Sequence, residues 1–390
     1  MSFGKRVRFS LLAAFLFFGG VEGILRARDF AFYVNFNADL LGMPLLDLTR
    51  LRRVANPTVA FDPRVFWRFQ PNQVLADPEV YRRPVRINNL GFRGDDFTPA
   101  KPAGSFRILC LGDSTTFGWS VGDRETYPEV LEQLLRERYP KRRFQVLNLG
   151  VTGYTSLQGR ELFLTQAANF QPDLVLFAFG PNDRLPALKS DAEHLAAGTW
   201  RISPIQVCLS RLQVYNLVRS GAVYLIRRSQ GLSLDPKTFL PHLKRKVQQA
   251  EFADNAAVVK RRCEELGAGF ILLNVDFPAL PMDHNFIALR QEAEKAAVTL
   301  PESFSFWDSS RVMETTAQGL GVPRIDLREL FTGELQRVRA SGTSLPDPAW
   351  NYLMIDNGHP NARGHRLIAE AILARMEAAP AFQRFLERAP

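Results

Sequence analysis

The stretch RILCLGDSTTFG, residues 107–118, runs from apolar residues into a serine. Its apolar part, residues 108–111, is typical of a strand that is covered on both faces, as strands of parallel sheets are. Gly112 permits a tight bend after this strand. Ser114 would then lie at the carboxyl end of the strand, where open α/β sheets place their functional sites. A turn made of common turn residues explains Gly112 to Ser114 equally well, so the rest of the chain has to decide.

Strand-like and helix-like segments alternate along the chain from residue 106 onward. The sequence predicts helices at 127–139, from about 157, at 254–266 and at about 362–378. It predicts strands at 107–111, 144–149, 174–179, 270–275 and 323–327. This alternation indicates an α/β fold in which a parallel sheet has helices on both faces.

The composition of the 390 residues is that of a globular protein, with 46% hydrophobic and 23% charged residues. The net charge is +9, but the basic residues form short clusters scattered along the chain, and no nucleic-acid-binding motif accompanies them. We therefore expect no nucleic-acid partner and assign the charge to a solvated surface near anionic lipid or an acidic polymer. The three cysteines form neither a disulfide framework nor a metal-binding spacing, and Cys110 is expected to be buried.

Residues 1–25 have the features of a signal peptide or a signal-anchor. Basic residues at 5, 6 and 8 precede residues 9–21, which hold no charge, and the apolar run resumes after Glu22. The uncharged run fits a signal-peptide core, whereas the run to residue 25 is just long enough to cross a bilayer. No A-x-A cleavage site follows, which favours an uncleaved anchor with its basic end in the cytoplasm. We expect the rest of the chain to be exported, into the periplasm or outside the cell. Secretion after cleavage and a buried core helix are the alternatives.

Two segments lie outside the regular alternation. Residues 26–104 are rich in proline, arginine and aromatic residues, which indicates irregular structure packed on the main domain. The connection at 186–250 is unusually long and holds apolar residues at helical spacing, namely Leu209, Leu212, Tyr215, Val218 and Leu225. We predict an inserted helical region there, with a helix packed on the edge of the domain. A lid that covers the substrate and a helix that faces a membrane are the alternatives.

Three later segments bring polar residues to the same edge of the predicted sheet as Ser114. Gly153 lies in the loop NLGVTGYTS after the second strand, and Asn182 lies in FGPNDR after the third. Asp356 and His359 lie in DNGHPNARGH, after the fifth strand and before a helix. In a parallel sheet all of these loops open on one edge. Their order along the chain therefore favours a single site over four unrelated turns.

A serine hydroxyl becomes a nucleophile when a base takes its proton, and a histidine can do so near neutral pH. His359 is the candidate base, and Asp356, three residues earlier, can hold the imidazole in one tautomer. The backbone N–H groups of Ser114 and Gly153 and the side-chain amide of Asn182 can stabilise the negative oxygen of a tetrahedral intermediate. This chemistry requires neither a metal nor an organic cofactor, and we expect none.

This set of segments resembles the SGNH hydrolases, also called the GDSL esterase/lipase family, over roughly residues 105–380. The matching residues are Ser114 in GDST, Gly153 in NLGVTG, Asn182 in GPND, and Asp356 with His359 in DNGHPN. The resemblance implies a hydrolase domain at 105–385 with a three-layer, flavodoxin-like α/β/α sandwich of about five parallel strands. It also implies that these residues are the nucleophile, two oxyanion donors and the acid–base pair. The segment NNLGFRG before the first strand is similar to that of membrane-tethered bacterial members, whereas the long connection departs from the compact family core.

From the residues and the resemblance we predict a serine esterase or acylhydrolase that cleaves an acetyl or other acyl ester through an acyl-enzyme intermediate. Its substrate would be a small-molecule or polysaccharide ester. An O-acyltransferase that modifies an envelope polysaccharide is one alternative, because the same site could pass the acyl group to a sugar hydroxyl. A non-catalytic binding protein that keeps the fold is the other, and the filled catalytic positions weigh against it.

Overall fold

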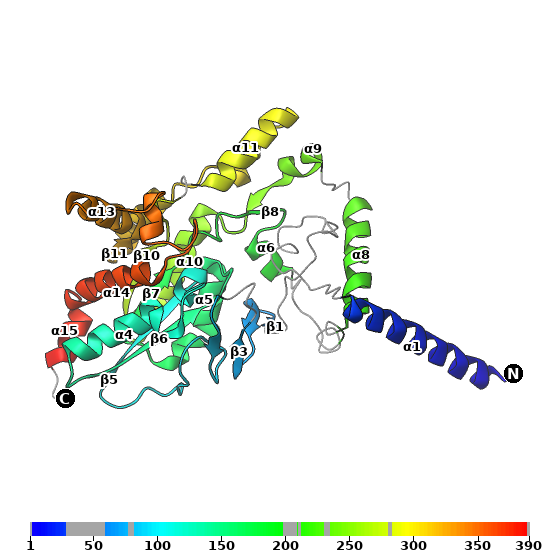
Figure 1. Cartoon of the computed structure of the whole chain (residues 1–390), viewed down its shortest axis with the longest axis horizontal. Helices are drawn as coiled ribbons and strands as arrows, with labels where there is room; N and C mark the ends of the chain where they lie inside the picture. The colour runs from blue at the N-terminus through cyan, green and yellow to red at the C-terminus, as the bar shows by residue number, and fades with distance from the viewer. Residues whose placement is uncertain are drawn as a thin grey trace.

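The computed structural model describes residues 2–28, 59–76, 82–197, 209, 212–229, 235–279 and 283–387. Its central sheet has five parallel strands in the order β11-β10-β7-β5-β6 (Figure 1). These strands are β5 (Ser105–Gly112), β6 (Arg143–Gly150), β7 (Leu174–Ala178), β10 (Gly269–Asn274) and β11 (Arg324–Asp326). The predicted α/β fold with a five-stranded parallel sheet is confirmed, and every predicted strand overlaps an observed one.

Helices cover both faces of this sheet, in three layers. Successive strand side chains alternate between the faces: Leu109 and Leu111 join one buried apolar cluster, whereas Ile108 and Cys110 join the other. The first cluster is completed by α5 (Ser156–Thr165), α10 (Gln249–Glu265) and α12 (Ser309–Leu320). The second is completed by α4 (Tyr127–Arg138), α13 (Leu327–Ala340), α14 (Ala362–Glu377) and α15 (Pro380–Glu387). Because both faces are covered, the central strands are rich in apolar residues, and β7 is apolar at every position.

Capping side chains set where two of these helices begin. Asn361 accepts the N–H of Gly364 at 3.0 Å, which starts α14 at the residue after Asn361, as predicted. In α10, Glu251 accepts the N–H of Gln248 at 2.7 Å. This contact starts α10 at residue 249, five residues before the predicted start at 254. Short 3₁₀ helices lie at Asp123–Glu125, Ala167–Phe170, Leu240–His242, Glu302–Phe304 and Ala349–Tyr352.

The described part of the region before β5 is more regular than the sequence predicts. β1 (Val59–Asp62) pairs antiparallel with β2 (Phe66–Phe69), and β3 (Gln73–Leu75) pairs with β4 (Val85–Ile87). Strands of three or four residues are too short to show a periodic pattern, which is why the sequence predicted irregular structure there. Phe66, Phe69 and Phe92 are buried in the same cluster as one face of the central sheet. Residues 29–58 and 77–81 of this segment lie outside the described residues.

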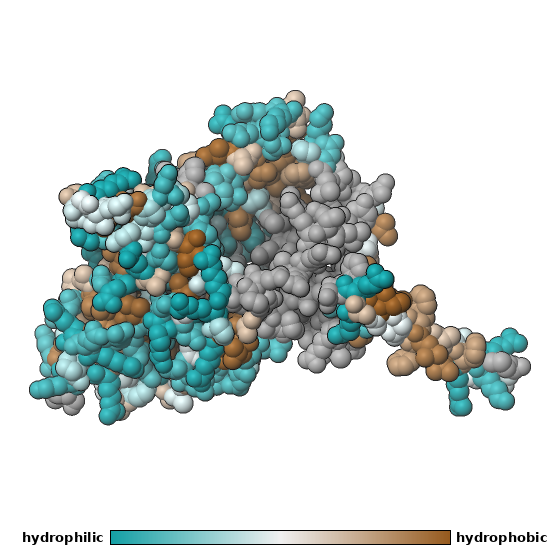
Figure 2. All heavy atoms as spheres, viewed as in Figure 1, coloured by the Kyte–Doolittle hydropathy of each residue, from teal (hydrophilic) through white to brown (hydrophobic). Residues whose placement is uncertain are grey.

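The amino-terminal helix α1 (Phe3–Ala27) projects away from the body of the molecule (Figure 1). None of its residues is buried, and Figure 2 shows apolar side chains uncovered along it. This exposure excludes the alternative of a buried core helix. Within the described residues, α1 is the one helix that is long and apolar enough to cross a bilayer. Such a helix at the start of a chain is typical of signal sequences and of membrane anchors.

The long connection between β7 and α10 carries several small elements. They are β8 (Pro186–Ala187), α6 (Asp191–Ala196), α8 (Gln213–Ser229), α9 (Pro236–Phe239) and β9 (Lys244–Arg245), which pairs antiparallel with β8. A further helix, α11 (His284–Ala296), follows β10. The sequence places the inserted helix on the edge of the domain, whereas the structure packs α8 against α1, where the N–H of Val214 donates to Glu22 Oε2 at 2.8 Å. A carboxylate inside the apolar run of α1 thus finds its partner at the start of α8.

Candidate active site

Strand β5 passes directly into the short helix α3 (Ser114–Phe117). Asp113 caps this helix, because its Oδ1 accepts the backbone N–H two residues further on at 2.9 Å. Gly112 has to be glycine: a Cβ there would lie 1.9 Å from Thr116 Oγ1 and 2.9 Å from a carbonyl oxygen of β7. Gly112 is therefore the last residue of β5, Asp113 is the capping residue, and Ser114 is the first residue of α3.

Ser114 and His359 meet although they are far apart along the chain. Ser114 Oγ lies 2.9 Å from His359 Nε2. On the other side of the ring, His359 Nδ1 lies 2.9 Å and 3.0 Å from the two carboxylate oxygens of Asp356. With its proton on Nδ1, the imidazole can accept the serine proton at Nε2. The structure thus brings these three residues together as a hydrogen-bonded chain of hydroxyl, imidazole and carboxylate.

The backbone around Asp356 fixes the direction of its carboxylate. Asp356 Oδ1 also accepts the N–H of Gly358 at 2.8 Å and the N–H of His359 at 2.9 Å. Burial acts to raise the pKa of Asp356, but the His359 side chain and these N–H donors together hold that pKa below its ordinary value. The carboxylate is therefore ionised at neutral pH and can stabilise a protonated imidazole.

Two backbone donors near Ser114 are not engaged. Gly153 lies in the loop after β6, the strand next to β5, and has a φ of +80°, a left-handed conformation that favours glycine. Within the part of the chain that the structure describes, the N–H groups of Gly153 and Ser114 make no hydrogen bond. Backbone donors inside a fold are nearly always paired, so unengaged ones are available to a ligand.

Asn182 lies in the loop after β7, and its side chain contacts the loops that carry Gly153 and Ser114. Its side-chain amide donates to the carbonyl oxygen of Tyr154 at 3.0 Å and to Asp113 Oδ2 at 3.3 Å. The second bond is at the long end of the normal range and is the weaker of the two. All five residues predicted from the sequence therefore lie near the carboxyl edge of the sheet, each in a loop or at the start of a helix.

Comparison with known proteins finds that part of this chain is similar to a family of lipases and acylhydrolases. Residues 110–293 match the GDSL-like lipase/acylhydrolase family. The matched region includes Ser114, Gly153 and Asn182, whereas Asp356 and His359 lie beyond it. No protein in the curated set matches the chain.

Solved structures with a similar fold include three hydrolases. LAE5, an alpha/beta hydrolase from the metagenome of Lake Arreo, Spain, is 20% identical, with 71% of this chain and 95% of that one covered and a TM-score of 0.40. The acetylxylan esterase Axe2 of Geobacillus stearothermophilus is 18% identical, with 69% and 93% covered and a TM-score of 0.39. The lipase/acylhydrolase of Enterococcus faecalis is 16% identical, with 70% and 95% covered and a TM-score of 0.39.

A buried carboxylate links the loop that carries Asn182 to α5. Asp183, next to Asn182, accepts the N–H of Ser156 at 3.1 Å, at the first residue of α5, and also accepts its hydroxyl. Ser156 Oγ in turn accepts from the amide of Asn255 in α10 at 3.0 Å. Burial raises the pKa of Asp183 to about 7, although its bonds from Ser156 act to lower it. Asp183 thereby ties the loop after β7 to the helix that follows the Gly153 loop.

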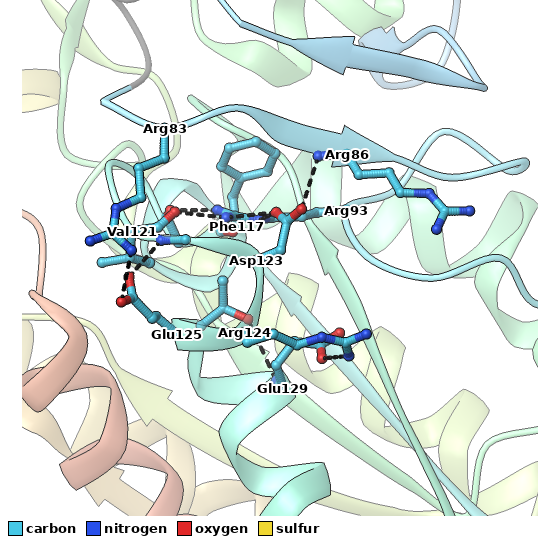
Figure 3. Close-up of polar contacts among 12 residues, drawn as sticks. Arg83, Arg86, Arg93, Phe117, Val121, Asp123, Arg124, Glu125 and Glu129 are labelled. Atoms are coloured by element: carbon cyan, nitrogen blue, oxygen red, sulfur yellow. Dashed lines mark hydrogen bonds and ion pairs between the residues drawn. The ribbon is translucent and has the colours of Figure 1, made fainter.

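Arg93, in the NNLGFRG segment, braces the chain that follows α3 (Figure 3). Its buried guanidinium donates to the carbonyl oxygens of Phe117 at 3.0 Å, Gly118 at 2.6 Å and Val121 at 2.7 Å. It also pairs with the carboxylate of Asp123 at 3.0 Å. Burial lowers the pKa of Arg93 and Asp123 raises it, and a guanidinium stays charged through such shifts. The segment before the first central strand thus holds the end of α3 in place.

The braced loop carries an aromatic ring to the imidazole. The ring centroids of Trp119 and His359 are 5.9 Å apart, with 35° between the ring planes. The N–H of Trp119 donates to the carbonyl oxygen of Ser114 at 3.0 Å, which links this loop to the start of α3. Trp119, which follows α3, therefore contacts the ring of His359.

A second histidine lies near this site but is not suited to proton transfer. His365 is fully buried, and its Nδ1 accepts the N–H of Tyr127 at 3.1 Å. Burial, together with the charge of Arg93, lowers the pKa of His365 to about 3. It is therefore a neutral structural residue, which leaves His359 as the candidate base.

Asp113, Arg93 and Trp119 were given no role from the sequence. The position of Asp113 before a helix start was a usable signal, because aspartate is a preferred capping residue. Arg93 could not be predicted, because it binds backbone carbonyl oxygens, which every residue has. Among the described residues, no group of three histidine, cysteine, aspartate or glutamate side chains could hold a metal ion.

Proposed function

We propose that this protein is a serine ester hydrolase that works through an acyl-enzyme intermediate. The observation that carries the proposal is the 2.9 Å contact between Ser114 Oγ and His359 Nε2, with Asp356 on the other ring nitrogen. This is the arrangement that turns a serine hydroxyl into a nucleophile. The match of residues 110–293 to a family of lipases and acylhydrolases supports the same chemistry.

In the proposed first step, His359 takes the proton of Ser114 while Oγ bonds to the carbonyl carbon of the ester. The negative charge that forms on the carbonyl oxygen is stabilised by the N–H groups of Ser114 and Gly153 and by the amide of Asn182. The 3.3 Å bond from Asn182 to Asp113 is weak enough to be exchanged for a bond to this oxygen.

In the second half of the reaction, His359 gives its proton to the leaving alcohol and the ester C–O bond breaks. His359 then takes a proton from water, whose oxygen attacks the acyl-enzyme, and the acid is released with Ser114 regenerated. Asp356 keeps the imidazole in one orientation throughout and stabilises its charged form.

We also propose that α1 anchors the protein in a membrane, with the sheet domain on the exported side. The helix is apolar and none of its residues is buried, and its basic residues at 5, 6 and 8 precede the apolar run, as at the cytoplasmic end of an anchor. An ester substrate would then be met outside the cytoplasm.

The test is hydrolysis of a series of esters, from acetyl to long-chain, by the parent and by Ser114→Ala. We expect Ser114→Ala to lower kcat by about 10⁴-fold or more, and Ser341→Ala, which changes an exposed serine after α13, to leave it unchanged. An acetylated sugar formed when free sugar is added would reveal transfer instead of hydrolysis. A Ser114→Ala enzyme with the parent's rate would overturn the proposal.

A further inference from the structure

Helix α8 carries uncovered apolar side chains beside the end of α1. Outside α1, the large hydrophobic residues that are exposed in the described chain include Leu212, just before α8, and Val218 and Leu225 within it. Val218 is 60% exposed and Leu225 is 64% exposed. With Ala222, which is also exposed, they repeat at spacings of four and three residues and so share one side of the helix. A soluble surface rarely leaves such a strip uncovered.

This strip continues the side of α8 that contacts α1. Val214, Leu217 and Gly221 are half-buried and lie at helical positions adjacent to the exposed ones. The two helices meet at the start of α8, where the N–H of Val214 donates to Glu22, and the apolar side continues along α8 from there. The environment that surrounds α1 near Glu22 therefore also contacts the exposed apolar strip of α8.

Glu22 forms the junction between the two helices. One carboxylate oxygen accepts the N–H of Val214 at 2.8 Å, and the other accepts from Arg26 at 2.7 Å. The first N–H groups of a helix have no partner inside the helix, so a carboxylate there satisfies a donor and meets the positive end of the helix dipole. This contact fixes the start of α8 at Glu22, close to the carboxyl end of α1.

The position of Glu22 gives the depth of α8 relative to a bilayer. The uncharged part of α1 from Phe9 to Val21 is about 20 Å long at 1.5 Å per residue. It can span an apolar interior of about 30 Å because the long basic side chains before it reach out to the head groups and the bilayer thins locally. When this part spans the interior, Glu22 lies at the boundary with the head groups, and α8 starts there. Figure 1 shows α8 crossing the end of α1, between α1 and the sheet domain.

We infer that α8 lies in the head-group region of the membrane, with the side formed by Val218, Ala222 and Leu225 against the acyl chains. This inference rests on the proposed anchoring by α1. The sequence of α8 contains three arginines and no acidic residue, a composition suited to anionic head groups. The consequence is that the sheet domain is held close to the bilayer surface by two contacts instead of hanging from a single helix.

The test places a probe on α8 in the full-length protein, reconstituted into vesicles. Cys110 and Cys263 are buried, so a parent with Cys208→Ser offers no ready thiol. A polarity-sensitive dye is attached through Ala222→Cys, and in a matched control through Lys295→Cys, whose side chain is 71% exposed in α11. Lipids with a spin label in the upper acyl chain should lower the emission at 222 by about twofold and leave that at 295 unchanged.

A second variant tests the apolar side itself. Val218→Asp with Leu225→Asp should bring quenching at 222 down to the level at 295, while hydrolysis of a water-soluble ester stays at the parent's rate. An unquenched probe at 222, in a chain that resists extraction by alkaline carbonate, would overturn the position of α8 but leave the anchor in place. If the probe at 222 is quenched neither by the spin-labelled lipid nor by iodide, a water-soluble quencher, then protein and not lipid covers the strip. Release of the parent chain by carbonate would overturn the anchor as well.

Discussion

Ser114, His359 and Asp356 form a chain of hydrogen bonds, and Asn182→Ala tests the proposed oxyanion half of the site. Its amide is the one side-chain donor among the three proposed for the oxyanion. Asn182→Ala should lower kcat by about 10²–10³-fold with little change in KM, because the lost bond is made mainly in the transition state. Steady-state kinetics on an activated ester measure both constants. An unchanged kcat would remove Asn182 from the site.

Arg93 makes a different prediction, because it acts through the loop that it holds. Arg93→Met would remove a hydrogen bond from each of three carbonyl oxygens and the ion-pair partner of Asp123. The loss of buried hydrogen bonds of this kind costs about 1–3 kcal/mol, and Tm should fall by several degrees. We also expect kcat to fall more than KM rises in the fraction that stays folded, since Ser114 and Trp119 lose their support.

The control for Arg93 is its neighbour Arg83 in the same network (Figure 3). Arg83 pairs with Glu125 at 3.0 Å, but its side chain is 62% exposed. Exposed pairs contribute less than about 1 kcal/mol, so Arg83→Met should leave both Tm and kcat close to the parent values. Equal effects of the two substitutions would contradict the assigned role of Arg93.

The five candidate residues could be found from the sequence because each follows a strand or precedes a helix in a recognisable motif. Ser114, Gly153 and Asn182 come directly after apolar runs, and the order of strands in a parallel sheet then brings them to one edge. Arg93 could not be found in this way. Its partners are carbonyl oxygens whose position depends on the conformation of a loop, and that conformation cannot be predicted from the residue types in the loop.

Among the secondary-structure elements, α5 and the loop after β7 are joined through buried carboxyl groups that respond to pH. Burial raises the pKa of Asp183 to about 7 and those of Asp113 and Asp191 to about 6, whereas their ordinary value is 3.8. A folded-state pKa above the unfolded value means that the folded protein binds the proton more tightly. The stability that these groups contribute is therefore present below about pH 4 and is lost as pH rises towards 6 to 7.

Asp183→Asn tests this sign. The amide keeps an acceptor for Ser156 but cannot ionise, so the variant avoids the cost of a buried charge. The Tm of Asp183→Asn relative to the parent should be higher at pH 8 than at pH 5, by several degrees, in thermal unfolding at the two pH values. A relative Tm that falls with pH would show that the carboxylate is stabilised in its charged form.

Elements with long apolar runs were predicted well, and those with sparse apolar residues were not. The central strands β5, β7 and β10 are buried on both faces and contain continuous apolar runs, which makes them easy to recognise. Helix α12 fully buries only Val312, Met313 and Ala317 among its hydrophobic residues, and it was not predicted. The short strands β1 to β4 were missed because their pairing, and not their composition, defines them.

For the molecule as a whole, the placement of α1 makes a prediction about fractionation. Leu12→Arg with Leu16→Arg puts two charges in the middle of the apolar helix, at a cost of about 2.5–3.5 kcal/mol each. We expect most of this variant to be lost from the membrane fraction after a carbonate wash, while Leu12→Ile with Leu16→Ile stays. If both variants remain in the membrane fraction to the same extent, α1 is not the anchor.

The overall arrangement shows where prediction from sequence ends. The apolar character of α1 and the helical spacing in α8 are both visible in the chain, but their contact depends on one carboxylate, Glu22, which from the sequence alone only interrupts an apolar run. The structure pairs it with the start of α8. Long-range pairings of this kind, like that of Ser114 with His359, become visible once the chain is folded.

The central claim is that Ser114 is made nucleophilic by His359. Its most direct measurement is the rate at which a fluorophosphonate adds to the protein, followed by intact mass and by mapping of the modified peptide. The account predicts a single adduct on Ser114, none in Ser114→Ala, and a rate lower by at least about 10³-fold in His359→Ala. An adduct at another residue, or an equal rate on Ser114 without the imidazole, would contradict it.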